Sequence, residues 1–211
     1  MKFLIILAST LILLQCDFDY DNPVDPDFNL THPGRLALAQ DGEWIRLDWN
    51  ANDHYTTGYQ IQRKSVDEEW IKLIDIKNTN QLTYVDTTCY TNVLYSYRIC
   101  GLADDNKSKF SNEPLMKVDF PAPYQIKGTA QSENSMRLSW DDSCTFEDGY
   151  KIFRKSENET EYTYIGNVNS YSSNYIDEGL NYNKVYLYYL IGYTEHNESL
   201  KSAEYNAMIK V

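Results

Sequence analysis

The chain has 211 residues, of which 42% are hydrophobic and 14% aromatic, and it contains 19 tyrosines. This composition is enough to fold one or two small domains, and it excludes collagen-like and wholly disordered chains. The formal net charge of −12 disfavours a broad electrostatic surface for DNA, RNA or an anionic bilayer, so no nucleic acid partner is expected. The composition therefore points to a folded protein, but it names no ligand.

Residues 1–15 have the pattern of a secretory signal peptide. Lys2 precedes an apolar run that ends at Leu14, and about a dozen residues are fewer than the ~20 that a membrane-spanning helix needs. Residues 13–16, with the sequence LLQC, resemble the lipobox of bacterial lipoproteins. The resemblance implies that Cys16 is lipidated and anchors an exported protein in the bacterial cell envelope, at the outer membrane or the cell surface. A lone cysteine in an ordinary signal peptide is the alternative.

Residues 16–32 are predicted to form an extended acidic tether. Two prolines, Pro23 and Pro26, exclude a helix or a central strand there. Like charges repel one another, so the segment is expected to reach on the order of 50 Å when fully drawn out at ~3.3 Å per residue. The five aspartates of this segment are Asp17, Asp19, Asp21, Asp25 and Asp27.

The spacing of the first three aspartates is also that of a calcium-binding loop of the EF-hand type. Such a loop requires a glycine at its sharp turn, where this chain has Asn22 followed by Pro23. It also requires a bidentate glutamate at its last position, where this chain has Phe28. We therefore expect a solvated spacer, with no metal and no cofactor.

The chain repeats itself at a shift of 91 residues. Arg46-Leu47-x-Trp49 matches residues 137–140, and Gly58-Tyr59-x-Ile61-x-Arg63-Lys64-Ser65 matches residues 149–156. With the positions that continue this register, about twenty residues are identical, which indicates two copies of one ancestral domain. We place the first domain at residues 33–120 and the second domain at residues 121–211.

Within each repeat the apolar residues alternate with a period of two, which predicts strands and no amphipathic helix. About seven short strands in 90 residues, separated by turn residues, are typical of an antiparallel β-sandwich. The predicted strands of the first domain include residues 44–49, 59–63, 70–73, 82–85 and 95–99.

These residues resemble the fibronectin type III domain. The marks of that family are a tryptophan that ends the second strand, a tyrosine that begins the third, and a tyrosine corner preceded by an apolar residue six positions earlier. Here they are Trp49 and Trp140, Tyr59 and Tyr150, and the pairs Cys89–Tyr95 and Leu180–Tyr186. The resemblance implies an all-β chain of two tandem antiparallel, immunoglobulin-like β-sandwiches. The corner hydroxyl is expected to bond to the backbone.

Two prolines, Pro121 and Pro123, lie between the repeats. A linker this short with two fixed φ angles predicts a semi-rigid rod. Cys89 and Cys144 lie in loops that end-to-end domains bring together, so a disulfide that locks the domains is one possibility and free thiols are the alternative.

No catalytic motif is present, and we expect no enzyme. The three histidines fall in predicted loops without the paired spacing of a metal or catalytic site. They are His32, His54 and His196.

The outward faces of the sheets differ between the repeats. Alternation predicts a wet outer face in the first domain, made by Gln60, Gln62, Lys64, Ser96, Arg98, Cys100 and Leu102. The second domain carries an apolar and aromatic stripe at the equivalent positions. We name this candidate binding face the outer face of the second domain: Phe153, Leu187, Tyr189, Ile191 and Tyr193, flanked by Lys151 and Lys155. If left uncovered, such a stripe is a contact site for a protein or a glycan. Cover by loops or lysine side chains is the alternative.

These observations leave three functions open. The first is a non-enzymatic, envelope-anchored binding or adhesion module whose partner is a protein or a glycan at the cell surface. The second is a structural spacer or assembly subunit of a surface or secretion complex. The third, by analogy with where such modules occur, is an accessory module of a carbohydrate-degrading system.

Overall fold

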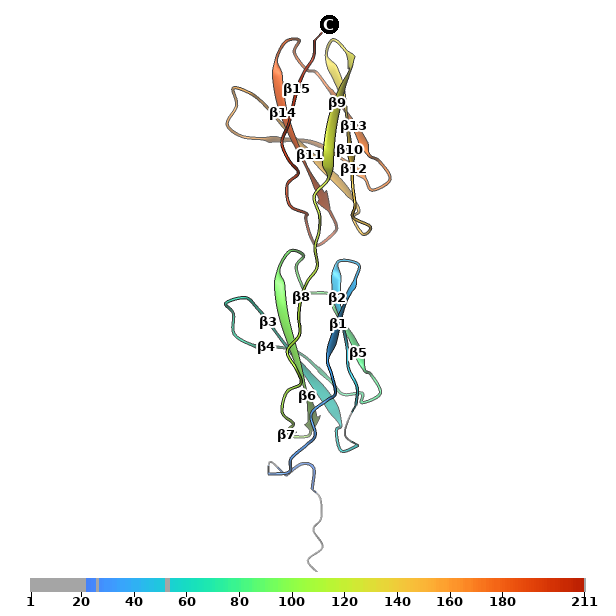
Figure 1. The fold of residues 1–211 in the computed structure, drawn as a ribbon, viewed down its shortest axis with the longest axis vertical. Coiled ribbons are helices and arrows are strands. Elements are labelled where there is room, and N and C mark those ends of the chain that lie inside the picture. The colour runs from blue at the N-terminus through green and yellow to red at the C-terminus, as the bar shows by residue number, and fades with distance from the viewer. Residues whose placement is uncertain (1–21, 26, 52–53, 211) are drawn as a thin grey trace, which may run out of the picture.

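The computed structural model describes residues 22–25, 27–51 and 54–210. The predicted signal peptide and Cys16 lie outside these residues. In the described part of the chain all the regular elements are β-strands, and none is a helix that could span a membrane. The strands form two sets that follow one another along the long axis of the molecule (Figure 1).

The first domain is a sandwich of two antiparallel sheets. One sheet has three strands in the order β1-β2-β5. The other has five, in the order β4-β3-β6-β7, with β8 also paired to β6. The strands are β1 (Ala37–Asp41), β2 (Trp44–Asp48), β3 (Gly58–Ser65), β4 (Ile71–Ile76), β5 (Thr83–Asp86), β6 (Leu94–Ala103), β7 (Asn106–Lys107) and β8 (Leu115–Lys117).

The second domain repeats this plan. Its sheets have the orders β13-β10-β9 and β12-β11-β14-β15. The strands are β9 (Tyr124–Ser132), β10 (Ser135–Asp141), β11 (Gly149–Ser156), β12 (Thr163–Asn169), β13 (Asn174–Glu178), β14 (Val185–Tyr193) and β15 (Tyr205–Met208). Even the register shifts correspond, because β3 slips against β4 after Ile61 and β11 slips against β12 after Ile152.

Each domain has its own hydrophobic core, as the repeat predicts. Inward-facing residues of both sheets fill it, and the tryptophan that ends the second strand supplies the largest ring. Trp49 packs edge-on against Tyr59, with ring centroids 5.5 Å apart, and Trp140 packs in the same way against Tyr150 at 5.3 Å. All four side chains are buried.

The tyrosine corners are confirmed in both domains. The Tyr95 hydroxyl accepts a hydrogen bond from the Tyr90 backbone N–H at 3.3 Å, and Tyr186 accepts one from the Asn181 N–H at 3.0 Å. Both corner rings are buried. Each corner therefore fixes the loop that enters β6 or β14.

A buried carboxylate joins the two sheets of each sandwich. Asp86 on β5 is fully buried and accepts hydrogen bonds from Arg63 on β3 at 2.6 Å and from the Tyr97 hydroxyl on β6 at 2.8 Å. The same set recurs 91 residues later in Arg154, Asp177 and Tyr188, with both bonds at 2.7 Å. A charge this deep is stable only because it has partners on both sides.

The described part of the predicted tether differs from the expected extended chain. Leu30 is 2% exposed, and the Phe28 ring packs edge-on against Tyr55 with centroids 5.3 Å apart. The Asn106 side-chain amide contacts three backbone carbonyls of this segment. The apolar side chains of Phe28 and Leu30 anchor this acidic segment to the first domain. Backbone hydrogen bonds from Asp25 to Asn22 and from Phe28 to Asp25 form the turns that fold it there. It lies at the end of that domain away from the second (Figure 1).

Candidate functional site

The sheet of the second domain brings the predicted face together. Phe153 on β11 stands directly opposite Tyr189 on β14, and Leu187 and Ile191 lie opposite the flanking lysines. The rings of Phe153 and Tyr189 stack with centroids 4.7 Å apart and an angle of 11° between planes. The stripe is therefore contiguous, as the alternation of side chains predicts.

The stripe is not left open to solvent. Tyr189 and Ile191 are only 9% and 8% exposed. Tyr162 covers Tyr189 from one side, with ring centroids 4.6 Å apart, and the Lys201 ammonium lies 4.5 Å from the Tyr189 ring centroid. Lys151 lies over Tyr193 in the same way at 5.2 Å. Side chains of the second domain itself thus cover part of the predicted contact surface. Cover by loops or lysine side chains was the alternative to an open contact site.

Solvent reaches three residues of the stripe, because Leu187 and Tyr193 on β14 are half-buried, as is Phe153 on the side toward β12. Phe153 is half-buried, and its ring meets the 49% exposed Tyr164 with centroids 5.7 Å apart. The Lys155 ammonium lies 4.8 Å from the Tyr162 ring centroid. The Tyr162 hydroxyl donates to Glu204, and burial together with this carboxylate raises the pKa of Tyr162. What remains accessible is a small aromatic edge with cations beside it.

The equivalent face of the first domain is covered too, contrary to the predicted wet surface. Arg98 on β6 is held between two aromatic rings, 4.1 Å from the centroid of Trp70 and 3.9 Å from that of Phe110. Its guanidinium also donates two hydrogen bonds to the Gln62 side-chain oxygen, at 2.8 and 2.9 Å. Three residues that were expected to be wet are buried: Gln60, Ser96 and Cys100. Trp70 and Phe110 come from neighbouring segments, so alternation along β3 and β6 does not show them.

A second candidate site, which sequence patterns did not indicate, lies between the domains. The Glu43 carboxylate of the first domain accepts hydrogen bonds from two side chains of the second, Thr194 at 2.6 Å and Asn197 at 2.7 Å. The Asn197 side-chain oxygen accepts a third bond from the Thr91 backbone N–H at 3.0 Å. Thr194 and Asn197 are buried.

Rings surround this polar core. Trp44 and His196 face one another across the domain boundary with centroids 5.4 Å apart, and Phe120 packs against Phe146 at 5.0 Å. Phe120 is buried against Gly192, where a Cβ atom would lie 3.1 Å from its ring. We name these residues the interdomain joint: Glu43, Trp44, Thr91, Phe120, Phe146, Gly192, Thr194, His196 and Asn197. His196 is an exposed loop residue, as expected, and its contact with Trp44, which the sequence did not indicate, makes it part of the rim of the joint.

The cysteines do not lock the domains. Cys89, Cys100 and Cys144 are all free thiols, so the possible Cys89–Cys144 disulfide is absent. Cys89 occupies the apolar position of the tyrosine corner, and its thiol donates to the Asp86 carbonyl within the first domain at 3.2 Å. Non-covalent contacts of the joint therefore hold the two domains together. Among the described residues no group of three or more potential metal-ligating side chains was found.

The strand order, the paired tryptophans and tyrosines and the two corners define a tandem pair of fibronectin type III sandwiches. Solved structures that are similar to this chain include the following two. A two-domain fibronectin type III segment of chicken tenascin has 15% identity and a TM-score of 0.47, covering 85% of this chain and 100% of that one. Domains FN1–FN3 of chicken CNTN1 have 16% identity and a TM-score of 0.41, covering 87% of this chain and 68% of that one. No family model and no curated protein matches the chain.

Proposed function

We propose that this chain is a non-enzymatic spacer arm of a bacterial cell envelope, anchored through a lipid on Cys16, that holds its second domain at a fixed orientation. The observation that carries the proposal is the interdomain joint. Three hydrogen bonds converge on Glu43 and Asn197, and an aromatic pair flanks them on either side. A flexible pair of binding domains needs none of these contacts.

Burial makes the joint stiffer than a short linker alone. Asn197 and Thr194 are buried, so separating the domains would expose their amide and hydroxyl groups together with the Phe120 ring. Two of the bonds end on one Glu43 oxygen and the third on the Asn197 side chain, so rotation of one domain against the other would break all three. Domain interfaces inside a chain usually permit relative motion, and a buried polar and aromatic interface opposes it.

The test is whether the two domains tumble as one body. We expect ¹⁵N relaxation of the soluble chain to give one shared rotational correlation time, and Asn197→Ala to give two separate ones. Leu200→Ala is the matched control, because Leu200 lies in the same segment between β14 and β15 and is 65% exposed. Independent tumbling in the unmodified chain would refute the spacer proposal.

The anchor needs its own test, because Cys16 lies outside the described residues. We expect the intact protein to fractionate with membranes and to carry a lipid mass on the peptide that begins at Cys16. Cys16→Ala should move it to the soluble fraction. A soluble, unlipidated wild-type protein would remove the envelope anchor and leave the rigid arm unaffected.

A second candidate function is binding of a protein or a glycan at the outer face of the second domain. The aromatic edge of Phe153 and Tyr164 favours it, since half-exposed rings beside cations suit such contacts. A glycan array and a pull-down would test it with a fragment that begins at Asp17. A fragment that begins at Pro33, where the sequence places the start of the first domain, would lack the buried Leu30, which belongs to the fold. Binding that is lost in Phe153→Ala/Tyr164→Ala and kept in Tyr171→Ala would establish it. The role in carbohydrate degradation remains a prediction.

A further inference from the structure

Each domain holds the part of the chain that precedes it through the same asparagine. In the first domain, the Asn106 amide nitrogen lies 3.0, 2.8 and 3.0 Å from the carbonyl oxygens of Pro23, Asp25 and Phe28. In the second domain, Asn197 lies 91 positions further along and bonds to Glu43 and Thr91. Both asparagines are buried, and each lies in the hairpin that follows β6 or β14, the equivalent strands of the two domains.

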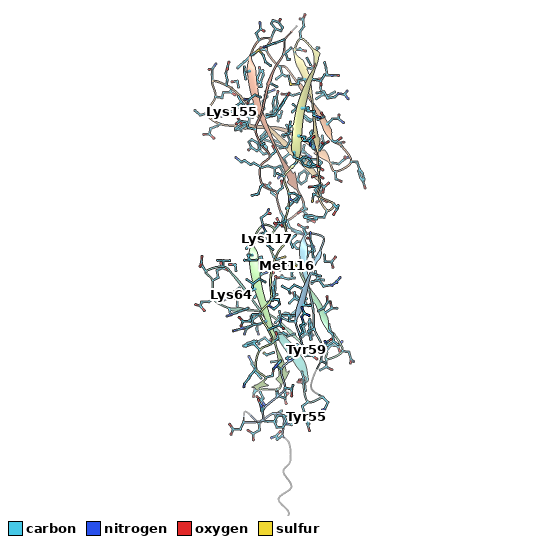
Figure 2. The ribbon with its side chains drawn as sticks, in the orientation of Figure 1. Tyr55, Tyr59, Lys64, Met116, Lys117 and Lys155 are labelled. Atoms are coloured by element: carbon cyan, nitrogen blue, oxygen red, sulfur yellow. The ribbon has the colours of Figure 1, made fainter. Side chains whose placement is uncertain are left out.

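An aromatic contact is repeated beside each asparagine. Tyr55 of the first domain and Phe146 of the second are also 91 positions apart. Tyr55 receives the ring of Phe28, and Phe146 receives the ring of Phe120, with centroids 5.3 and 5.0 Å apart. Tyr55 lies at the end of the first domain that points away from the second (Figure 2). The two contacts thus occupy the same end of two equivalent domains.

From these matched contacts we infer that this end of each sandwich is a docking socket. In the second domain the socket receives the first domain, and in the first domain it receives the described residues 22–25 and 27–30 of the same chain. We name this segment the N-terminal foot. The foot takes the place that a preceding domain would occupy, so it is a structural part of the first domain and not a tether.

The foot has the internal order that such a role requires. Its backbone N–H groups at Asp25, Phe28 and Leu30 donate to carbonyls of Asn22, Asp25 and Phe28, at 3.0, 2.9 and 3.1 Å. These turns gather the carbonyls that the Asn106 amide contacts. Without the foot, a buried amide and the pocket that Leu30 fills would lose their partners, and both effects oppose release.

The opposite end of the second domain does not offer a partner for a further socket. Glu43, which Asn197 holds, corresponds to Asn134 in the second domain, and Trp44 corresponds to Ser135. The carboxylate and the indole that make the joint are therefore replaced by an amide and a hydroxyl at the equivalent positions of the second domain. The socket of the first domain is suited to its own foot, and a second copy of this chain lacks the matching groups.

Hydrogen exchange of the full chain, read by mass spectrometry, tests the inference. The amides of Phe28 and Leu30 should be protected in the unmodified protein. Asn106→Ala should accelerate their exchange roughly tenfold or more, because the foot opens locally while the sandwich stays folded. Lys109→Ala, at an exposed position just after β7, is the matched control, and Asn197→Ala should leave the foot protected.

Phe28→Ala keeps the inference testable should Asn106→Ala disturb the β6–β7 hairpin. This change leaves the sandwich intact and removes only the ring that Tyr55 receives, so it should also release residues 27–30. Unprotected amides in the unmodified chain would overturn the socket. Protection that survives both Asn106→Ala and Phe28→Ala would overturn it as well. Neither result bears on whether the two domains tumble together.

Discussion

At the scale of single residues, the buried carboxylates Asp86 and Asp177 connect sequence to stability most directly. Asp86 accepts from Arg63 and Tyr97 through one oxygen and from the Thr88 backbone and hydroxyl through the other, at 2.9 and 2.7 Å. Burial, followed by the negative charge of Asp86, raises the pKa of Tyr97 and keeps its hydroxyl a donor. The repeat shows that Arg63 and Asp86 recur, but their meeting depends on how two sheets face each other.

We predict that Asp86→Ala lowers the free energy of unfolding of the first domain by about 3–5 kcal/mol, since it leaves a guanidinium and a buried hydroxyl without their acceptor. Urea denaturation followed by tryptophan fluorescence measures the loss. Asp48→Ala is the control, because its ion pair with Arg46 is exposed and such pairs contribute only about 0–1 kcal/mol. Equal losses in the two variants would contradict the role of Asp86.

The three described thiols predict how the stability of the folded chain depends on pH. Burial raises the pKa of Cys89, Cys100 and Cys144 from 9.0 to about 11 each. The folded chain therefore keeps these protons longer than the unfolded chain, and stability falls as pH rises from about 9 towards 11. At pH 8 we expect iodoacetamide to label Cys144 slowly and the fully buried Cys89 and Cys100 more slowly still, as mass spectrometry would detect. Labelling of Cys89 at the rate of the unfolded chain would refute this.

At the scale of strands and sheets, alternation predicts which way a side chain points but not what lies over it. Cys100 points outward from β6, as predicted, and is nevertheless buried. The cover over this face comes from Trp70, just before β4, and Phe110, after β7. Arg98 and Phe110 correspond to Tyr189 and Lys201 of the second domain, 91 positions further along. In the first domain a cation on the strand packs against a ring from a neighbouring segment. In the second domain a ring on the strand packs against a cation from the equivalent segment.

From this exchange we predict that Arg98 stabilises the outer face of the first domain. Arg98→Ala should lower the free energy of unfolding by about 2 kcal/mol, because two ring contacts of a partly buried cation are lost together with the bonds to Gln62. Lys64→Ala is the matched change, since its ammonium contacts only Trp70, at 5.0 Å. Denaturation curves of the two variants should differ clearly, and coincident curves would argue against the stack.

The fold was therefore predictable and much of the site was not. Alternation, the repeated tryptophans and the corner tyrosines specify two sandwiches, because each depends on local spacing and on the burial of large rings. The joint depends on Glu43 and Asn197, which lie 154 positions apart. Glu43 has no counterpart in the second repeat, so no pattern within one domain marks it. The packed foot was missed because its acidic composition conceals two apolar anchors, Phe28 and Leu30.

At the scale of the whole molecule, the foot and the joint are equivalent contacts that follow one another along the chain. Each is made at the socket end of a sandwich. The foot therefore fixes the orientation of the first domain, and the joint fixes the orientation of the second domain relative to the first. Because Phe28 and Leu30 pack on the first domain, the connection between the proposed lipid and the folded body is shorter than the tether expected for residues 16–32. A stiff arm on so short a connection suits a spacer that sets distance and direction together.

Gly192 tests this stiffness without removing a hydrogen bond. A methyl group there would lie 3.1 Å from the Phe120 ring and 3.5 Å from the Ser199 hydroxyl, so the Phe120 ring must move by a few tenths of an ångström within the joint. We predict that Gly192→Ala gives the two domains separate correlation times in ¹⁵N relaxation, while each sandwich stays folded. Gly101→Ala is the control, because the equivalent methyl group meets Thr56 inside the first domain and does not touch the joint. A Gly192→Ala chain that still tumbles as one body would mean that the hydrogen bonds of Glu43 and Asn197 or the linker prolines, and not the packing of Phe120, make the arm rigid.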